Sequence, residues 1–430
     1  MASAPVSIVP LTSPPDCSVR VPGSKSYTNR ALIAAALGRG HSVLSGALFS
    51  DDTHYMQGAL DTLGVRVTSD LAKHEFEVDG AGGQIPERDV ELFVGNAGTA
   101  ARFLTVLVSL GSGNTRMDGT ARMRERPMAD LVTALRSLGV SITEHGKPGC
   151  FPMTINGQNR IRGPVSVSLP GNASSQFISG LVLSAPCFGA DVEVKVVGDL
   201  VSKPYLDMTA AVMASFGVEL EYADYTRFFL RAGQAYTGRS YAIEPDASAA
   251  SYFFAAAAIT GGRVTVEGLG TTTKQGDWGL VDVLERMGAK VLREPTRTTV
   301  IGTGKLVGVE VDMKDLSDVA QTLAVVAPFA SSPTTINGIG FIRHKETDRV
   351  GAVVKELGRL GIRAEEHADG YTVHPGLPSA GLVHTYDDHR MAMSFALLGL
   401  KAPGISIDDP ACTSKTFPNY FDVLAQLHAK

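Results

Sequence analysis

Six stretches of helical length are apolar on nearly every side, and each opens on polar residues. Their starts are Asn29 (NRALIAAAL), Thr99 (TAARFLTVLV), Ser174 (SSQFISGLVL), Ser248 (SAASYFFAAAAI), Asp318 (DVAQTLAVVAPFA) and His389 (HRMAMSFALLGL). We therefore predict six helices, one in each of six similar segments.

A second helix follows each of the first five starts and ends in the same way. An apolar residue and a glycine close the helix, and an alternating strand comes next. These endings are LGVRV at Gly64, LGVSI at Gly139, FGVEL at Gly217, MGAKV at Gly288 and LGIRA at Gly361. Because the endings recur at intervals of roughly 70 to 80 residues, the chain is predicted to consist of copies of one supersecondary unit.

Each copy is predicted to contain a strand, a helix, a strand, a helix and one or two further strands, which gives an α/β fold. The sixth copy stops in its second helix, YFDVLAQLHAK, and lacks its closing strand. The N-terminal segment SIVPL precedes the first helix and could supply that strand. The chain would then close on itself.

The length of 430 residues exceeds one ordinary core and suits two domains. We expect residues 24–244 to form a first domain of three copies, and residues 1–23 with 245–430 to form a second domain of three copies. The chain would cross between the domains near residues 22 and 244. Two crossings make a hinge, and ligands commonly bind in the cleft between hinged domains.

Composition excludes several classes of function. A net charge of −5 leaves no global basic surface for nucleic acid. There is no apolar run long enough to span a membrane and no signal-peptide pattern at the N-terminus. The four cysteines are far apart and fit a reduced, cytoplasmic protein: Cys17, Cys150, Cys187 and Cys412. No nucleotide-binding glycine motif or metal-ligand cluster is present.

Basic residues gather at or near the helix starts in both halves of the chain. They are Lys25, Arg30, Arg126, Lys345, Arg349, Arg390 and Lys415. A helix start already carries partial positive charge and unpaired N–H groups, so a cation is unfavourable there unless an anion binds too. Six helix starts directed into one cleft would therefore bind ligands with several negative charges.

Other side chains add to this picture. Gly98 in the GNAGT segment lets a ligand approach the backbone closely. Hydroxyl groups at Ser174, Ser175 and Ser202 suit a phosphate. Asp318 and Glu346 are two acids among many cations, which makes them candidates for proton transfer.

Each of these features also has a simpler explanation on its own. Asp246 is best read as a plain helix cap, and a lone histidine such as His389 more often makes structural hydrogen bonds. The RMRERP segment with Arg122 and Arg124 could be a solvated surface run. Only the number of cations, considered jointly, favours an anion-binding site.

Eight motifs occur in order along nearly the full length: PGSKSxTNRAL, GNAGTAxRF, RMRERP, SSQF, LVSKPY, HKETDR, YDDHRMAM and DPxCTxKTFP. Together they closely resemble the EPSP synthase family, the 5-enolpyruvylshikimate-3-phosphate synthases. The resemblance implies a two-domain inside-out α/β barrel with six βαβαββ repeats (EPT/RTPC-like). It also implies transfer of the enolpyruvyl group of phosphoenolpyruvate to the 5-hydroxyl of shikimate 3-phosphate, with release of phosphate and without a cofactor.

The resemblance also assigns residues to ligands. The residues that match shikimate 3-phosphate contacts are Lys25, Ser26, Arg30, Ser174, Ser175, Gln176, Ser202, Tyr205, Asp318 and Lys345. The residues that match phosphoenolpyruvate contacts are Lys25, Asn96, Gly98, Arg126, Gln176, Arg349, His389, Arg390 and Lys415. By the same resemblance, Asp318 accepts the proton of the 5-hydroxyl and Glu346 protonates the enol methylene. Whether Lys25 takes part in proton transfer stays open.

Two positions depart from the family pattern. Phe341 stands where many relatives have Asn, so the polar contact that Asn would make to shikimate 3-phosphate is in question. Phe103 stands where many relatives have Pro, which questions the response to glyphosate, the family's inhibitor, but not the reaction. The remaining expectations are a monomer, with no nucleic acid or membrane as partner.

Two other functions were weighed. The sister enolpyruvyl transferase that acts on UDP-N-acetylglucosamine usually has a Lys-Asn pair and a loop cysteine. Here the pair is Lys25-Ser26, and residues 112–126 contain no cysteine. A non-enzymatic anion-binding repeat protein would have no reason to place one Asp and one Glu among seven cations.

Overall fold

The chain is described here from a computed structural model that covers residues 4–85, 89–158, 164–172 and 174–428. Residues 1–3 and 429–430 of the predicted second domain lie outside the described residues. The chain divides into two compact units: Gly23–Ile243, called the N-unit, and Met1–Pro22 with Glu244–Lys430, called the C-unit. The chain passes between the units after Pro22 and after Ile243, one residue from each boundary expected from the sequence.

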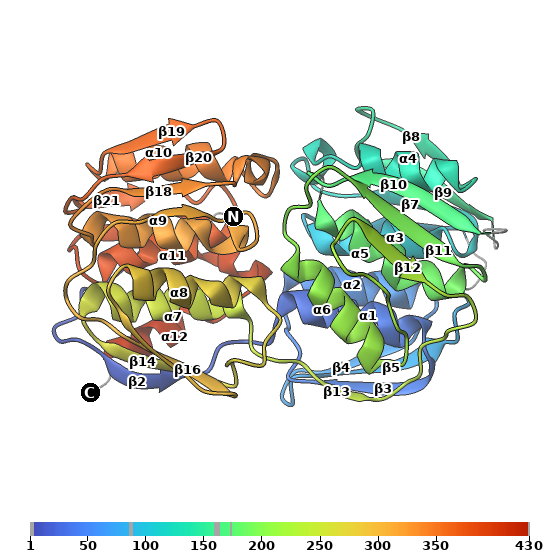
Figure 1. The fold of residues 1–430 in the computed structure, drawn as a ribbon, viewed down its shortest axis with the longest axis horizontal. Coiled ribbons are helices and arrows are strands. Elements are labelled where there is room, and N and C mark those ends of the chain that lie inside the picture. The colour runs from blue at the N-terminus through green and yellow to red at the C-terminus, as the bar shows by residue number, and fades with distance from the viewer. Residues whose placement is uncertain (1–3, 86–88, 159–163, 173, 429–430) are drawn as a thin grey trace. The chain divides into compact units, whose positions relative to one another are not determined.

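The N-unit contains three sheets and six α-helices among its described residues (Figure 1). Its elements are α1 (Lys25–Leu37), β3 (Arg39–Ser45), α2 (Asp51–Thr62), β4 (Val67–Asp70), β5 (Glu75–Ala81), β6 (Val90–Phe93), α3 (Gly98–Val108), β7 (Ser112–Asp118), η1 (Met123–Glu125), α4 (Ala129–Ser137), β8 (Ser141–Glu144), β9 (Met153–Gln158), β10 (Val165–Pro170), α5 (Ser175–Ser184), η2 (Ala185–Cys187), β11 (Val192–Val197), α6 (Pro204–Ser215), β12 (Arg227–Leu230) and β13 (Ser240–Ala242). The strand orders are β13-β3-β5-β4, β6-β7-β9-β8 and β10-β11-β12.

The C-unit repeats this plan. Its elements are β1 (Val6–Ser7), β2 (Asp16–Val19), α7 (Ala247–Thr260), β14 (Arg263–Glu267), η3 (Gly276–Gly279), α8 (Leu280–Arg286), β15 (Lys290–Arg293), β16 (Arg297–Ile301), β17 (Glu310–Asp312), η4 (Ser317–Val319), α9 (Ala320–Val326), η5 (Ala327–Phe329), β18 (Thr334–Asn337), η6 (Gly340–His344), α10 (Arg349–Arg359), β19 (Ala364–His367), β20 (Gly370–Val373), β21 (Gly381–Val383), α11 (His389–Gly399), β22 (Ile405–Ile407), η7 (Pro410–Lys415), α12 (Tyr420–Ala425) and η8 (Gln426–His428). The strand orders are β2-β14-β16-β15, β17-β18-β20-β19 and β1-β22-β21.

Every four-stranded sheet is assembled in the same way. The first strand runs parallel to the second, and the second pairs antiparallel with a strand that in turn pairs antiparallel with the remaining one. Two first strands are exchanged: β13, from the end of the N-unit, pairs with β3, whereas β2, which precedes α1, pairs with β14. This exchange closes each unit on itself.

The N-terminal strand completes the sixth repeat. β1 pairs antiparallel with β22, with Val6 opposite Ile407. The prediction that the SIVPL segment supplies a strand to the sixth copy is therefore confirmed.

One predicted strand is absent from the described residues of the third repeat. After Gly217, the FGVEL segment forms no strand, and the next residue, Glu221, makes an isolated bridge with Phe229. The next residues turn sharply, because the hydroxyl groups of Tyr222 and Tyr225 both donate to Asp207 on α6. The strand prediction was wrong there because pairing with β12 is limited to this single bridge before the chain turns.

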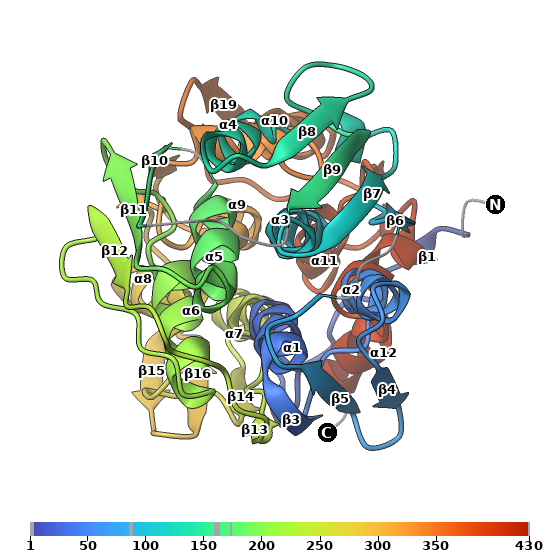
Figure 2. The same cartoon turned by 90° about the vertical axis from the view of Figure 1, so that its right-hand side faces the viewer.

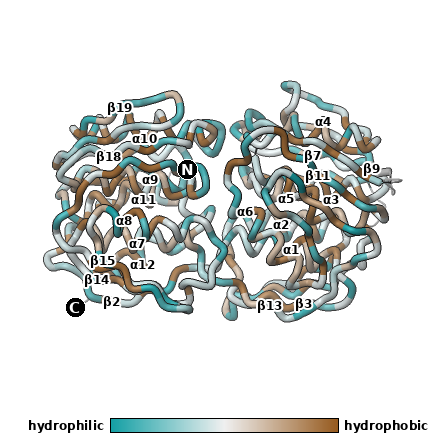
Figure 3. The backbone as a smooth tube through the Cα atoms, in the orientation of Figure 1, coloured by the Kyte–Doolittle hydropathy of each residue, from teal (hydrophilic) through white to brown (hydrophobic). Residues whose placement is uncertain are grey.

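The helices with apolar faces all round form the centre of each unit. All described residues of α3, α9 and α11 are buried, as are nearly all of α1, α5 and α7. Figure 2 shows α1, α3 and α5 enclosed by the N-unit sheets, and Figure 3 shows the hydrophobic colour along these central helices. The six helices predicted from the sequence are confirmed, although the fifth begins as η4 before α9. The sheets lie around these six central helices, whereas helices such as α2 and α4 keep exposed faces.

Candidate active site

The first helix of the N-unit begins with a charged residue. Ser24 caps α1 by accepting a hydrogen bond from the backbone N–H of Tyr27 (3.4 Å). Lys25 is the first helical residue, and its Nζ lies 3.4 Å from Oδ2 of the buried Asp52. Asp52 in the first turn of α2 therefore offsets the cation at this helix start.

Arg30 is almost entirely engaged by the protein. Its guanidinium group donates to Thr209 Oγ1 (2.8 Å), to the backbone oxygens of Ser26 (2.9 Å) and Tyr205 (3.0 Å), and to Ser179 Oγ (3.3 Å). It also lies over the ring of Phe103, 5.4 Å from the centroid. Burial lowers the pKa of Arg30 to about 10. At most one N–H remains for a ligand, so Arg30 mainly orders the helices around the site.

The candidate phosphate-binding hydroxyls stand at two other helix starts. Ser174 caps α5 by accepting from the N–H of Gln176, whose amide donates to Thr99 Oγ1 (3.0 Å) on α3. Ser175 is buried directly behind this cap. Ser202 is buried ahead of α6 with a φ of 58°, a backbone conformation that is unusual for serine and common at binding sites.

The glycine-rich start of α3 is held by two arginines. Arg126 donates to both the backbone oxygen and Oδ1 of Asn96, each at 3.0 Å. Arg102 donates to the backbone oxygen of Gly98 (3.0 Å). A Cβ atom at Gly98 would collide with both guanidinium groups. Glycine is thus required if these two side chains are to keep their positions.

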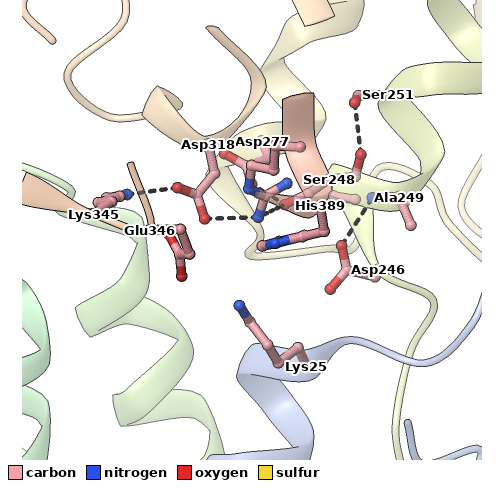
Figure 4. A network of polar contacts seen from close by, with 12 residues as sticks. Lys25, Asp246, Ser248, Ala249, Ser251, Asp277, Asp318, Lys345, Glu346 and His389 are labelled. Carbon is pink, nitrogen blue, oxygen red and sulfur yellow. Dashed lines mark hydrogen bonds and ion pairs between the residues drawn. The ribbon is translucent and has the colours of Figure 1, made fainter. Parts of the chain in front are cut away.

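In the C-unit, Asp318 is the centre of a cluster of cations (Figure 4). Lys345 Nζ lies 2.5 Å from Oδ1, and Arg349 NH1 lies 3.2 Å from the same oxygen. Arg390 NH2 lies 2.8 Å from Oδ2. Burial lowers the pKa of Lys345 against the opposing effect of Asp318.

Arg349 joins two further carboxylates. Its guanidinium group contacts Glu346 Oε2 (2.7 Å) and both oxygens of Asp388 (2.8 and 3.2 Å). Burial by itself would lower the pKa of Arg349, but the neighbouring carboxylates raise it above its usual range. Asp388 also caps α11 by accepting from the N–H of Arg390 (2.9 Å).

The turn ahead of α11 has an unusual backbone. Tyr386 and Asp387 both have φ values of 56°. His389 follows, fully buried, with Nδ1 3.7 Å from Asp388. Burial raises the pKa of the Asp387 carboxyl, against the opposing effect of Lys415 in η7. Lys415 is therefore near this turn.

Each unit thus brings together its own share of the predicted residues. In the N-unit these gather at the starts of α1, α3, α5 and α6: Lys25, Ser26, Arg30, Asn96, Gly98, Arg126, Ser174, Ser175, Gln176, Ser202 and Tyr205. In the C-unit they gather around Asp318 and α11: Asp318, Lys345, Glu346, Arg349, His389, Arg390 and Lys415. Within the described residues, no group of acidic, histidine or cysteine side chains could hold a metal ion.

The structure also answers points on which the sequence was ambiguous. Asp246 caps α7 by accepting from the N–H of Ala249 (2.9 Å), as predicted. Arg122 pairs with Glu125 (2.8 Å) and Arg124 pairs with Asp118 (2.6 Å). At the other departure from the family pattern, Lys345 Nζ lies 5.7 Å from the ring centroid of Phe341, so a cation–π contact is made there.

Sequence reasoning missed the acids that pair with the predicted cations. They are Asp52, beside Lys25, and Asp277, which accepts from the Ser248 hydroxyl behind Arg390. A systematic search for acids in the first turns of helices would have found Asp52, which lies in the first turn of α2. No sequence signal marks Asp277.

The fold is that of an enolpyruvyl transferase. It resembles the solved structure of the enolpyruvyl transferase NikO from Streptomyces tendae, with a TM-score of 0.75, 18% identity, and coverage of 99% of this chain and 98% of that one. It also resembles EPSP synthase from Acinetobacter baumannii, with a TM-score of 0.83, 25% identity and the same coverage of both chains.

Sequence comparison narrows the class to one family. The sequence model of EPSP synthase (3-phosphoshikimate 1-carboxyvinyltransferase) matches residues 12–424. The enzyme named 3-phosphoshikimate 1-carboxyvinyltransferase from Trichormus variabilis is 50% identical over 416 residues, which is 97% of each chain. The chloroplastic enzyme of that name from Arabidopsis thaliana is 44% identical over 427 residues, covering 95% of this chain and 82% of the relative. The chain belongs to the EPSP synthase family, and the fold and family predicted from the sequence are confirmed.

Among the described residues, the structure contains no helix with the length and apolar character that crossing a membrane requires.

Proposed function

We propose that this chain transfers the enolpyruvyl group of phosphoenolpyruvate to the 5-hydroxyl of shikimate 3-phosphate and releases phosphate. The observation that carries the proposal is the arrangement around Asp318. One carboxylate contacts three cations, and one of these, Arg349, also holds a second carboxylate, Glu346. Such a cluster can bind polyanionic ligands and move protons at two separate positions.

The residues described above fall into two sets, one for each substrate. The hydroxyls of Ser174, Ser175 and Ser202 and the ammonium of Lys345 suit the phosphate of shikimate 3-phosphate. Tyr205 adds to the phosphate contacts, Gln176 lies against the ring, and Ser26 holds the carboxylate region together with the remaining N–H of Arg30. The donor takes the cations of both units: Lys25, Arg126, Arg349, Arg390 and Lys415, beside Asn96, Gly98 and His389.

The reaction needs a proton at one carbon and the loss of a proton from one oxygen. Glu346 gives its proton to the methylene carbon of phosphoenolpyruvate, and the neighbouring carbon becomes cationic. The 5-hydroxyl oxygen attacks that carbon while Asp318 takes the hydroxyl proton. A tetrahedral intermediate forms, and the cations stabilise its charge.

The intermediate then breaks down. The bond between the central carbon and the phosphate oxygen breaks, with the electron pair leaving on phosphate. The methyl group returns a proton to Glu346, and the enol double bond forms again. Both carboxylates must therefore cycle between two protonation states.

The ion pair between Glu346 and Arg349 indicates how binding of the donor would prepare Glu346 to carry a proton. Arg349 NH2 lies 2.7 Å from the Glu346 carboxylate. A donor carboxylate that binds Arg349 would compete for that contact. Glu346 would then be free to accept the proton that it later gives to the methylene.

The groups that carry this mechanism all come from one chain, so a monomer suffices. The four cysteines form no disulfide, which suits a reducing compartment such as the cytoplasm. Glyphosate is expected to compete with phosphoenolpyruvate at the donor cations.

The test is the release of phosphate from phosphoenolpyruvate by the purified chain. Release should require shikimate 3-phosphate and should not occur with UDP-N-acetylglucosamine in its place. Release with the sugar nucleotide would favour the sister transferase. Binding of both anions without any release would favour a non-enzymatic anion-binding protein.

A further inference from the structure

A line of hydrogen bonds runs from Asp318 into the interior of the C-unit (Figure 4). Arg390 NH2 donates to Asp318 Oδ2 (2.8 Å) and to Ser248 Oγ (3.3 Å). Ser248 Oγ in turn donates to Oδ2 of Asp277. The line therefore begins at a reacting carboxylate and ends at a second, buried one.

The chemistry of these groups gives the line one direction. A guanidinium group only donates hydrogen bonds, and an ionised carboxylate only accepts them. Ser248 has one hydroxyl hydrogen, which goes to Asp277, so its lone pairs face Arg390. Each bond polarises the next, which strengthens the whole line.

The location of Asp277 argues against a merely incidental contact. It lies in η3, which packs against α7 and η4, and only 5% of it is exposed. Burying a charged carboxylate is costly unless it is paired with a cation or hydrogen-bonded. Its charged neighbours are Asp318 from η4, Asp246 at the start of α7 and Arg390 from α11.

We propose that Asp277 is a positioning residue for the transfer reaction: it fixes the Ser248 hydroxyl, and Ser248 holds Arg390 in place against Asp318. The inference rests on the proposed function, because Arg390 and Asp318 take their roles in donor binding and proton transfer from it. Asp277 itself touches neither substrate in this account.

Kinetics of four variants test the line: Asp277→Ala, Asp277→Asn, Ser248→Ala and the double alanine variant. For Asp277→Ala, kcat/KM for phosphoenolpyruvate should fall on the order of 10- to 100-fold, because a charge-assisted support of Arg390 is lost. Asp277→Asn keeps the shape and one acceptor, so it should lose less. The dissociation constant for shikimate 3-phosphate without donor should stay within about two-fold, because most of its phosphate contacts lie in the N-unit.

The double variant is the sharpest comparison. If Asp277 acts through Ser248, the double variant should be no worse than Asp277→Ala alone. Independent losses that multiply, or a kcat/KM that stays at the wild-type value in a correctly folded Asp277→Ala, would overturn the proposal. The matched control is Asp282→Asn on α8, an exposed carboxylate that pairs with Arg293 at 2.5 Å and should keep wild-type kinetics.

A second readout does not depend on activity. Trp278, the single tryptophan of the chain, directly follows Asp277 and donates from Nε1 to Thr298 Oγ1 (2.9 Å). Burial, reinforced by the negative charge of Asp318, raises the pKa of Asp277 to about 6. Tryptophan emission should therefore change with a midpoint near pH 6, and the change should disappear in Asp277→Asn.

In Ser248→Ala the midpoint should move to higher pH, because the carboxylate loses a donor that favours its charged form. An unchanged midpoint, or no transition that depends on Asp277, would contradict the bond from Ser248 to Asp277. A wild-type chain without transferase activity would instead refute the proposed function and leave this titration as the deciding test of the hydrogen-bonded line.

Discussion

At the scale of single residues, the guanidinium group of Arg349 is the common partner of three carboxylates. It contacts Asp318, Glu346 and Asp388 through separate N–H groups and is only 1% exposed. Removing one partner from such a buried set leaves a charge without compensation, which is costly. Arg349 therefore holds the two proposed proton carriers, Asp318 and Glu346, together with Asp388, which caps α11.

The first prediction concerns the two proton carriers. Asp318→Asn and Glu346→Gln should each lower kcat by on the order of 100-fold or more, because a positioned acid or base typically contributes that much. The affinity for shikimate 3-phosphate should change far less. Steady-state kinetics and equilibrium binding check this, with Asp312→Asn on the surface strand β17 as control. Near wild-type turnover in either variant would show that its assigned role is wrong.

The second prediction concerns Gly98 and glyphosate. A methyl group there would push against Arg126 and Arg102, so Gly98→Ala should raise the Michaelis constant for phosphoenolpyruvate and the inhibition constant of glyphosate. Glyphosate is the longer ligand, and its constant should rise more. Gly58→Ala is the matched control, because a Cβ atom there meets nothing within 4 Å. Equal shifts of the two constants would mean that the position does not discriminate by ligand size.

At the scale of elements, the turn before α11 is the most constrained feature of the C-unit. Tyr386 and Asp387 have left-handed backbone conformations, which are unfavourable for residues with side chains. Glu356, fully buried on α10, accepts from the Tyr386 hydroxyl (2.6 Å) and from the backbone N–H of His384 (2.9 Å). Helix α10 thus holds the turn that presents Asp388 and Arg390.

The third prediction follows from this support. Glu356→Ala should destabilise the chain by about 2 to 4 kcal/mol, since two hydrogen bonds to a buried carboxylate are lost. It should also raise the Michaelis constant for phosphoenolpyruvate. Tyr386→Phe removes only one of these bonds and should cost about 1 kcal/mol. Denaturant unfolding measures both, and equal losses for the two variants would contradict the account.

The same scale shows what could be predicted from the sequence. The six central helices could be predicted because each copy repeats one Ala-rich, apolar stretch of helical length, for example along α7. The segment after Gly217 was misassigned because its conformation depends on Tyr222, Tyr225 and Asp207, which are brought together only by folding. The internal contacts of Arg30 could not be predicted for the same reason. Nor could Asp52 as the partner of Lys25, or Asp277 as the carboxylate behind Ser248 and Arg390.

At the scale of the whole molecule, the exchanged strands β2 and β13 tie the two ends of the repeat series together. In the C-unit, β14 pairs with β2, which lies before α1 in the chain. In the N-unit, β3 pairs with β13, which lies after α6. The chain therefore passes between the units at two places, after Pro22 and after Ile243. Motion between the units would require changes at both passages.

The fourth prediction concerns such a motion. The cations proposed to bind the substrates belong to both units, so a polyanion that contacts both should favour a more closed form. Small-angle scattering should show a smaller radius of gyration when shikimate 3-phosphate saturates the protein, with shikimate, which lacks the phosphate group, as the control. An unchanged radius at saturation would contradict closure.

The central claim is that this chain makes an enol ether by protonating and then deprotonating the donor's methylene carbon. Proton and phosphorus NMR of the reaction in D2O tests it most directly. The account predicts equal amounts of phosphate and enolpyruvyl product, with deuterium from the solvent in the product's methylene group, and none of these signals without shikimate 3-phosphate. Phosphate formed without the enol ether, or an enol ether whose methylene never contains deuterium, would contradict it.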